Sequence, residues 1–235
     1  MIPHRRRHDL HYTCAPKAPS NDSNYGHCGY SGNRPHPYGR CHKPVAPAFY
    51  SARSLNVALA EVDADRGAYY SLAAYQIVKP ITVMAIGEFD YFWRTGCPFL
   101  GHEISKDIED YEKFLERQDA HVLVVIDAFF ADKFMRSAYT ELDYRLISAI
   151  ADVMFSGVSR AHEPVDALVY PSVAFREGLN FAIQPEAYRD KLRLIPEQTR
   201  ILEITDVVGF GIDGYHSRKQ ISDVSSSGEL FWQEI

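Results

Sequence analysis

The chain has 235 residues, of which 46% are hydrophobic and 24% charged, a composition close to the average for globular domains with a sizeable core. Its net charge of −6 is uneven, because residues 1–45 carry seven Lys/Arg against two Asp, a net +5 that leaves −11 for the rest. The acidic remainder argues against nucleic acid as the main ligand. No apolar run approaches the ~20 residues of a membrane span, and four cysteines in a chain of this length predict a reducing cytosol.

The composition changes near residue 45 and divides the chain into three parts. Residues 1–37 are rich in Cys, His and Pro with little apolar periodicity, and we expect an irregular N-terminal extension there. Residues 38–205 carry the patterns of a packed domain. Residues 206–235 form a C-terminal extension to which the sequence assigns no role.

The expected elements of the central domain begin with a short strand at 46–51 and a helix over 54–64, which Ser54 caps. Strands follow at 69–78 and 81–86, and then a polar helix at 104–117. Residues 119–135 are strand-like in composition at first, but their apolar residues recur at helical spacing, so we favour a helix. Phe129, Phe130 and Phe134 are expected to pack in the core rather than to stack on bases.

A clearer helix is expected at 140–155, with an apolar face made of Leu142, Leu146, Ile147, Ile150 and Met154. Two short strands, 167–170 and 180–183, flank a turn, and 193–205 closes the patterned region. Strands mixed with helices, without regular βαβ alternation, predict an α+β fold with a mixed sheet and flanking helices.

Four polar residues lie at the boundaries of these elements. Arg40 lies on a Gly/Pro-rich loop, Tyr50 at a strand end, and Glu61 just past an Ala-Leu-Ala helical stretch. Ser172 follows a buried strand after Pro171, and strand ends are where binding groups gather in sheet proteins. By spacing alone, the first three are more typical of a surface arginine, a half-buried tyrosine and an exposed helix glutamate than of a binding cleft.

In the order of their motifs, residues 38–205 resemble the RES domain family of bacterial toxins that degrade NAD⁺. The family's Gly-Arg loop, Leu-Tyr strand end, Ala-Leu-Ala-Glu helix, Tyr-Pro-Ser turn and Gly…Asn strand correspond to residues 39–45, 49–50, 58–61, 170–172 and 178–183. Tyr38, Cys41 and His42 depart from the family's loop but leave Arg40 in place. The resemblance implies a fold similar to that of ADP-ribosyltransferases.

The resemblance also implies cleavage of the nicotinamide–ribose bond of NAD⁺, by phosphorolysis or hydrolysis. NAD⁺ is then a substrate, phosphate a co-substrate in the first case, and no resident cofactor is expected. Arg40 is expected to donate two hydrogen bonds to the pyrophosphate. Tyr50 is expected to stack on nicotinamide or adenine and to orient phosphate or ribose through its hydroxyl. Glu61 is expected to stabilise the oxocarbenium-like charge, and Ser172 to bond the ribose or the carboxamide.

The sequence leaves two alternatives open: an ADP-ribosyltransferase that modifies a protein or small molecule, and a catalytically silent RES scaffold used for binding. The absence of a Gly-x-Gly-x-x-Gly fingerprint after a strand argues against a Rossmann dehydrogenase. The partner that the resemblance implies is a separate helix-turn-helix antitoxin. A homodimer is the default expectation, although no interface is specified.

The N-terminal region contains Cys and His side chains of the kind that bind structural zinc. The pairs are spaced about a dozen residues apart, which fits no standard zinc finger, and we therefore favour loop residues and predict no metal site. The pairs in question are His11 and Cys14, His27 and Cys28, and Cys41 and His42.

Overall fold

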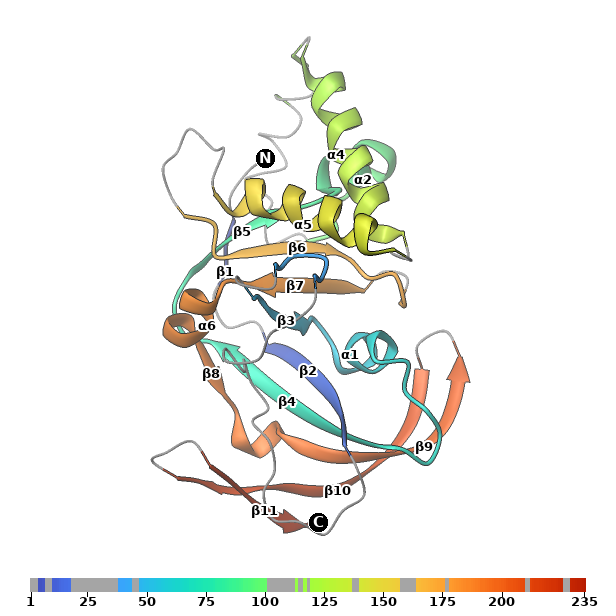
Figure 1. The fold of residues 1–235 in the computed structure, drawn as a ribbon, viewed down its shortest axis with the longest axis vertical. Coiled ribbons are helices and arrows are strands. Elements are labelled where there is room, and N and C mark those ends of the chain that lie inside the picture. The colour runs from blue at the N-terminus through green and yellow to red at the C-terminus, as the bar shows by residue number, and fades with distance from the viewer. Residues whose placement is uncertain are drawn as a thin grey trace.

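The computed structural model describes residues 4–6, 10–17, 38–43, 47–100, 113, 116–117, 119–136, 140–156, 164–175, 178–209, 212–225 and 229–235. These residues form a single mixed sheet with helices against it, which confirms the predicted α+β class (Figure 1). In spatial order the strands are β1 (His4–Arg6), β5 (Ile81–Ala85), β6 (Ala167–Pro171), β7 (Leu179–Ile183), β3 (Phe49–Ala52), β2 (Leu10–Lys17), β4 (Tyr69–Ile77), β9 (Arg200–Gly209), β10 (Ile212–Val224) and β11 (Leu230–Glu234). A further strand, β8 (Leu192–Leu194), pairs with β4.

Only one of the strand pairs in the described part of the chain is parallel, that of β5 with β6, and the others are antiparallel. The β6–β7 and β3–β7 pairs matter most for function, because they place Tyr170 and Ala52 opposite Asn180, and Tyr50 opposite Ala182. Opposite residues in an antiparallel pair point to the same face of the sheet. These side chains therefore share one face.

The helices are α1 (Leu55–Glu61), α2 (Glu88–Thr95), α4 (Ala120–Met135), α5 (Glu141–Phe155) and α6 (Pro185–Lys191), with a 3₁₀ turn at Pro196–Gln198. Helices α2, α4 and α5 gather over the part of the sheet formed by β5, β6 and β7, and α1 lies beside β3 (Figure 1). None of the helices in the described part of the chain is long and apolar enough to cross a membrane.

The core lies on both faces of the sheet. Under α4 and α5, a cluster around Phe134, Ile147, Leu168 and Tyr170 is buried. On the opposite face, Phe181, Val169, Tyr75 and their neighbours pack against one another and against α6. The alternation of Leu168 and Tyr170 with Val169 along β6 follows from the two-residue period of a strand that is buried on both faces.

Several predicted elements are confirmed. The helix at 119–135 is α4, the helix at 140–155 is α5, and the strands at 69–78, 81–86, 167–170 and 180–183 correspond to β4, β5, β6 and β7. The Ser54 side chain accepts a hydrogen bond from Val57 N, as a helix N-cap does. The predicted polar helix at 104–117 lies almost wholly outside the described residues.

Three expectations are corrected. Residues 10–17, within the segment expected to be irregular, form β2 between β3 and β4. On α5, Ile147 and Met154 are buried and Ile150 packs against the core as expected, but Leu142 and Leu146 are 73% and 50% exposed. Phe134 is buried as expected, but Phe129 is 50% exposed.

Beyond residue 205, β9 continues into a hairpin with β10, to which β11 is added, so residues 206–235 extend the same sheet.

Candidate functional site

Glu61 lies at the centre of a hydrogen-bonded group that brings three elements together. It is the last residue of α1, and its Oε1 accepts hydrogen bonds from Ser172 Oγ at 2.5 Å and from Asn180 Nδ2 at 2.6 Å. Ser172 and Asn180 are buried, whereas Glu61 is exposed. We call Glu61, Ser172 and Asn180 the carboxylate group. Both donors converge on Oε1, and Oε2 has no partner among the described residues. Glu61 is thus held by two buried donors while the residue itself remains exposed.

The turn after β6 aligns Ser172. Its backbone N–H donates to Gly178 O at 2.8 Å, and its Oγ accepts from Phe175 N at 3.0 Å while donating to Glu61. A serine hydroxyl with one acceptor and one donor partner has little rotational freedom. The turn therefore fixes the serine, and the serine fixes the carboxylate.

Gly178 allows α1 to approach this turn. A Cβ at position 178 would lie 2.6 Å from Val57 Cγ2 and 3.0 Å from Phe175 O, closer than such atoms can pack. Val57 is a buried residue of α1. A glycine is thus required at this position for α1 to lie where Glu61 reaches Ser172 and Asn180.

Arg40 belongs to a second group, on the loop before β3. Its Nη1 donates to Phe134 O at 2.7 Å and to Arg136 O at 2.8 Å, so the guanidinium closes the C-terminus of α4. The end of a helix exposes unpaired carbonyls and a partial negative charge, which a cation stabilises. Nε and Nη2 have no acceptor within the described part of the chain. Arg40 therefore holds its loop against the end of α4 through Nη1.

Tyr50 supports the same loop from the sheet. Its hydroxyl accepts a hydrogen bond from Cys41 N at 2.8 Å and lies 2.9 Å from His42 Nδ1. Burial raises the pKa of the Tyr50 hydroxyl well above its ordinary value, and the neighbouring Cys41 adds to the rise, so the group stays protonated at neutral pH. We call Arg40, Cys41, His42 and Tyr50 the loop group.

Tyr170 lies between the two groups. It is buried and contacts Phe134, with ring centroids 5.3 Å apart, and its hydroxyl forms a hydrogen bond with the Cys41 side chain. Burial is the largest cause that raises the pKa of Tyr170, and negative charge on Cys41, Tyr50 and Glu61 would raise it further. The positive charge of Arg40 acts in the opposite direction. The carboxylate of Glu61 and the guanidinium of Arg40 thus act on the same phenol from the two groups.

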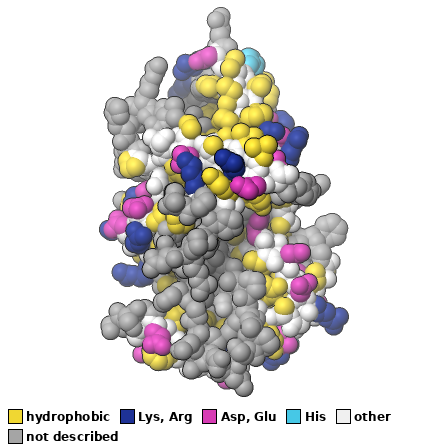
Figure 2. Space-filling model, in the orientation of Figure 1, with side chains coloured by type: hydrophobic (Ala, Val, Ile, Leu, Met, Phe, Trp, Pro, Cys, Tyr) yellow, Lys and Arg dark blue, Asp and Glu magenta, His cyan; other side chains and the backbone are white. Residues whose placement is uncertain are grey.

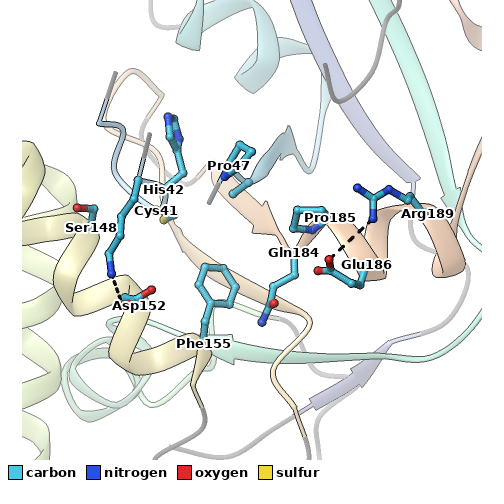
Figure 3. A pocket seen from close by; sticks show the side chains of 12 residues that line it. Cys41, His42, Pro47, Ser148, Asp152, Phe155, Gln184, Pro185, Glu186 and Arg189 are labelled. Carbon is cyan, nitrogen blue, oxygen red and sulfur yellow. Dashed lines mark hydrogen bonds and ion pairs between the residues drawn. The ribbon is translucent and has the colours of Figure 1, made fainter. Parts of the chain in front are cut away.

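A cavity of about 330 Å³ adjoins the loop group (Figure 3). Cys41, His42 and Lys43 form one wall, and Gln184 and Pro185 another. Lys43 forms an ion pair with Asp152 of α5. Figure 3 shows Glu186 paired with Arg189 on α6. Gln184 follows Asn180 by four residues, or about 13 Å along a strand. The cavity therefore lies at the opposite end of β7 from the carboxylate group.

The structure brings Glu61 and Ser172 into direct contact and places Arg40 and Tyr50 in the loop group, where the Tyr50 side chain reaches the loop from β3. Glu61, Arg40 and Tyr50 all act on Tyr170, and Ser172 follows it by two residues. The sequence analysis assigned no role to Asn180 or to Tyr170. Both lie in segments that carried the resemblance, Asn180 in the Gly…Asn strand and Tyr170 in the Tyr-Pro-Ser turn. These motifs could have suggested the two residues. Among the residues that the structure describes, no three His, Cys, Asp or Glu side chains gather as a metal site would require.

The fold and the site define a class of protein: an α+β domain in which a solvent-facing carboxylate is held by a serine and an amide, next to an arginine-bearing loop. The chain belongs to the RES domain family, whose profile matches residues 3–204. The match begins before β1 and so includes both N-terminal strands. No curated protein and no solved structure shows a significant match to the chain.

Proposed function

We propose that this protein cleaves the bond between nicotinamide and ribose in NAD⁺, and that it acts as the toxin of a toxin–antitoxin pair. The observation that carries the proposal is the carboxylate of the exposed residue Glu61, which is held through Oε1 by the buried side chains of Ser172 and Asn180. Membership of the RES domain family supports NAD⁺ as the substrate.

The proposed reaction needs a negative charge beside the ribose. As the C1′–N bond breaks, its electron pair leaves with neutral nicotinamide, and positive charge develops on C1′ and the ring oxygen. A preorganised carboxylate stabilises such a transition state, since it requires no reorganisation when the charge appears. Water or phosphate then attacks C1′; in the hydrolytic case the water proton goes to solvent, and the products are ADP-ribose and nicotinamide.

The other residues of the site act on this carboxylate or on the substrate. Ser172 and Asn180 position Glu61 through their hydrogen bonds to its Oε1. The Nε and Nη2 donors of Arg40 are suited to one or two oxygens of the pyrophosphate. Tyr50 offers substrate its ring rather than its hydroxyl, because that hydroxyl is engaged with Cys41 and His42.

The acceptor and the regulating partner are parts of the same proposal. Water, phosphate and a side chain of a target protein can each approach a carboxylate that faces solvent, and the third case is the transferase alternative. A helix-turn-helix antitoxin, encoded as a separate protein, is the proposed partner that restrains the activity, as the resemblance implies.

The test is the release of free nicotinamide from NAD⁺ by purified protein, with and without phosphate, beside the variants Glu61→Gln and Glu197→Gln. Glu197 is an exposed glutamate of the 3₁₀ turn and serves as the matched control. We expect Glu61→Gln to lower the rate at least about 100-fold, in the range found when one preorganised charge or donor is removed, with an unchanged circular dichroism spectrum. Glu197→Gln should retain the wild-type rate.

Each alternative predicts a different result. Near-normal release by folded Glu61→Gln protein would exclude the proposed role of this residue. A folded wild-type protein that releases no nicotinamide in either buffer would favour the silent scaffold. Nicotinamide release together with ADP-ribose retained on a protein would identify a transferase.

A further inference from the structure

Helix α4 exposes large apolar side chains while a carboxylate lies on its buried face, beside the apolar residues Val124, Ala131 and Phe134. Its buried residues include Asp127, whose carboxylate accepts hydrogen bonds from Gly87 N and Phe89 N at 2.9 Å each and so caps the start of α2. Its outward stripe consists of Val122, Val125, Ile126 and Phe129, which are 59%, 67%, 41% and 50% exposed. A helix that exposes such a stripe is incompletely buried within its own chain.

Helix α5 exposes a second apolar stripe, made of Leu142, Leu146 and Val153 at 73%, 50% and 55% exposure. Beside it, an apolar groove of about 450 Å³ runs between Phe130 of α4 and the residues Ile150 and Met154 of α5. Figure 2 shows hydrophobic side chains continuing along the upper part of the molecule, where Figure 1 places α4 and α5. We call the seven exposed residues of the two stripes the α4–α5 face.

The area of this face is suited to a subunit interface. Seven large apolar side chains at these exposures present roughly 700 Å², more than the ~300–600 Å² of the largest apolar patch on a typical monomer. A standard interface buries ~800 Å² on each partner, so two copies that meet through this face reach the size of a stable dimer. A smaller peptide-like ligand would leave much of it exposed.

The charges on the face also favour a second copy. In a two-fold interface each residue near the axis meets its own counterpart, so a charged residue there would face a like charge. The nearest cation on α4 is Lys133, one turn beyond the stripe, whose Nζ lies 5.2 Å from the centre of the Phe129 ring. Two copies can therefore meet through Val122, Val125 and Ile126 without opposed charges, provided that the axis lies nearer the start of α4 than Lys133.

We infer that the α4–α5 face is the interface of a homodimer. The inference does not depend on the proposed reaction, because none of the seven residues belongs to the carboxylate group or the loop group. Apolar burial of this kind on both subunits is expected to give a dimer that persists at micromolar concentrations.

The experiment measures the mass of the full-length chain in solution, by sedimentation velocity over a range of concentrations up to tens of micromolar. The variants are Val125→Glu on α4 and Leu142→Glu on α5, each a highly exposed position where glutamate suits a helix. Val208→Glu is the matched control, because Val208 on β9 is 66% exposed and outside the face.

We expect the wild-type chain and Val208→Glu to sediment as a dimer, at twice the 26.7 kDa of one chain. Val125→Glu and Leu142→Glu should each weaken the dimer by more than about tenfold in dissociation constant, since every copy carries the new charge into the interface. Circular dichroism confirms that each variant folds. Because the two variants lie on separate helices, one still tests the interface if the other fails to fold. A monomeric wild type, or a dimer that neither variant weakens, would overturn the inference.

Discussion

The carboxylate group and the loop group lie on two sides of Tyr170, yet their polar atoms have different partners. In the carboxylate group, Glu61 is bonded by two side chains, Ser172 and Asn180, and remains exposed. In the loop group, the hydrogen bonds reach the main chain: Arg40 donates to two carbonyls at the end of α4, and Tyr50 accepts from an amide.

This difference separates positioning from structural support. Main-chain groups must be paired wherever they are buried, so the contacts of the loop group contribute to the fold itself. A side-chain network that ends on a solvent-facing carboxylate contributes less, because water can replace a lost partner of Glu61. Changes in the carboxylate group should therefore lower turnover, and changes in the loop group should first lower stability.

The largest effect on turnover within this comparison, after loss of the carboxylate itself, is expected for Ser172→Ala. Without the hydroxyl, Glu61 keeps only Asn180 as a donor to Oε1 and turns away from its fixed direction. Misplacement of a reacting group by about 1 Å costs up to ~100-fold in rate, and we expect a loss of that order in kcat for nicotinamide release.

The control for this variant is Ser156→Ala, at the end of α5, where the hydroxyl bonds only Val153 O. The free energy of unfolding of Ser172→Ala should fall by about 1–2 kcal/mol, because the variant loses the hydrogen bond to the exposed Glu61 and the one from Phe175 N. An unchanged kcat in Ser172→Ala would show that Glu61 does not depend on the serine for its position.

Arg40→Ala should have the largest effect on stability. The variant leaves the carbonyls of Phe134 and Arg136 without their donor, and each hydrogen bond to a charged group contributes about 1.5–3 kcal/mol. One of these bonds is exposed, so we expect the free energy of unfolding in urea to fall by about 2–3 kcal/mol in total. Calorimetry should also show weaker NAD⁺ binding.

The matched control is Arg66→Ala, which removes an exposed arginine whose ion pair with Asp206 spans 3.7 Å. Surface pairs of this kind contribute about 0–1 kcal/mol, so its unfolding curve should almost coincide with that of the wild type. If Arg40→Ala unfolds like the control while its NAD⁺ affinity falls, Arg40 binds the substrate but does not stabilise the fold. The proposed difference between the two groups would then be wrong.

The sequence located the residues of the site better than it located the contacts between them. Glu61 follows a helix with a recognisable cap, and Ser172 follows a strand that proline ends, so both positions are visible in local patterns. The contact of Asn180 with Glu61 requires β7 to lie beside β3, and that pairing joins segments more than 120 residues apart. Local periodicity does not contain this information.

The same reason explains the missed strand β2 and the apolar residues of α4 and α5 that were expected in the core but are exposed. Residues 10–17 include Pro16, which is uncommon inside a sheet, and their partners in β3 and β4 lie far along the chain. For α4 and α5, apolar spacing predicted which residues share a stripe but not which stripe meets the sheet. Asp127 could be placed inside only once α2 was known to begin beside it.

Gly178→Ala should disturb the carboxylate group through the backbone. The added Cβ would meet Val57 Cγ2 at 2.6 Å, and since Val57 is buried, α1 must move away from the turn. Overpacking of this kind costs about 1–2 kcal/mol of unfolding free energy, and the displaced Glu61 should lower kcat as well. Turnover equal to that of the wild type would show that the position of α1 is not critical.

A double variant makes this prediction sharper. Val57→Ala removes the methyl group that the new Cβ would meet, so Gly178→Ala combined with Val57→Ala should recover part of the lost turnover. The two changes should be non-additive by about 0.5 kcal/mol or more, because they share one contact. If the effects are additive, the clash with Val57 is not what destabilises Gly178→Ala, and the close contact with Phe175 O is the remaining cause.

The smallest effect concerns Cys41, which should be inert in the folded protein. Burial raises the pKa of its thiol far above the ordinary value, and the thiolate is the form that reacts. At pH 8, iodoacetamide should therefore label the exposed Cys97 and leave Cys41 unmodified, as peptide mass mapping can show. Arg40→Ala, which releases the loop from α4, should make Cys41 accessible. Labelling of Cys41 as fast as Cys97 in the wild type would mean that the loop group opens readily, and that the support it gives to the site is not rigid.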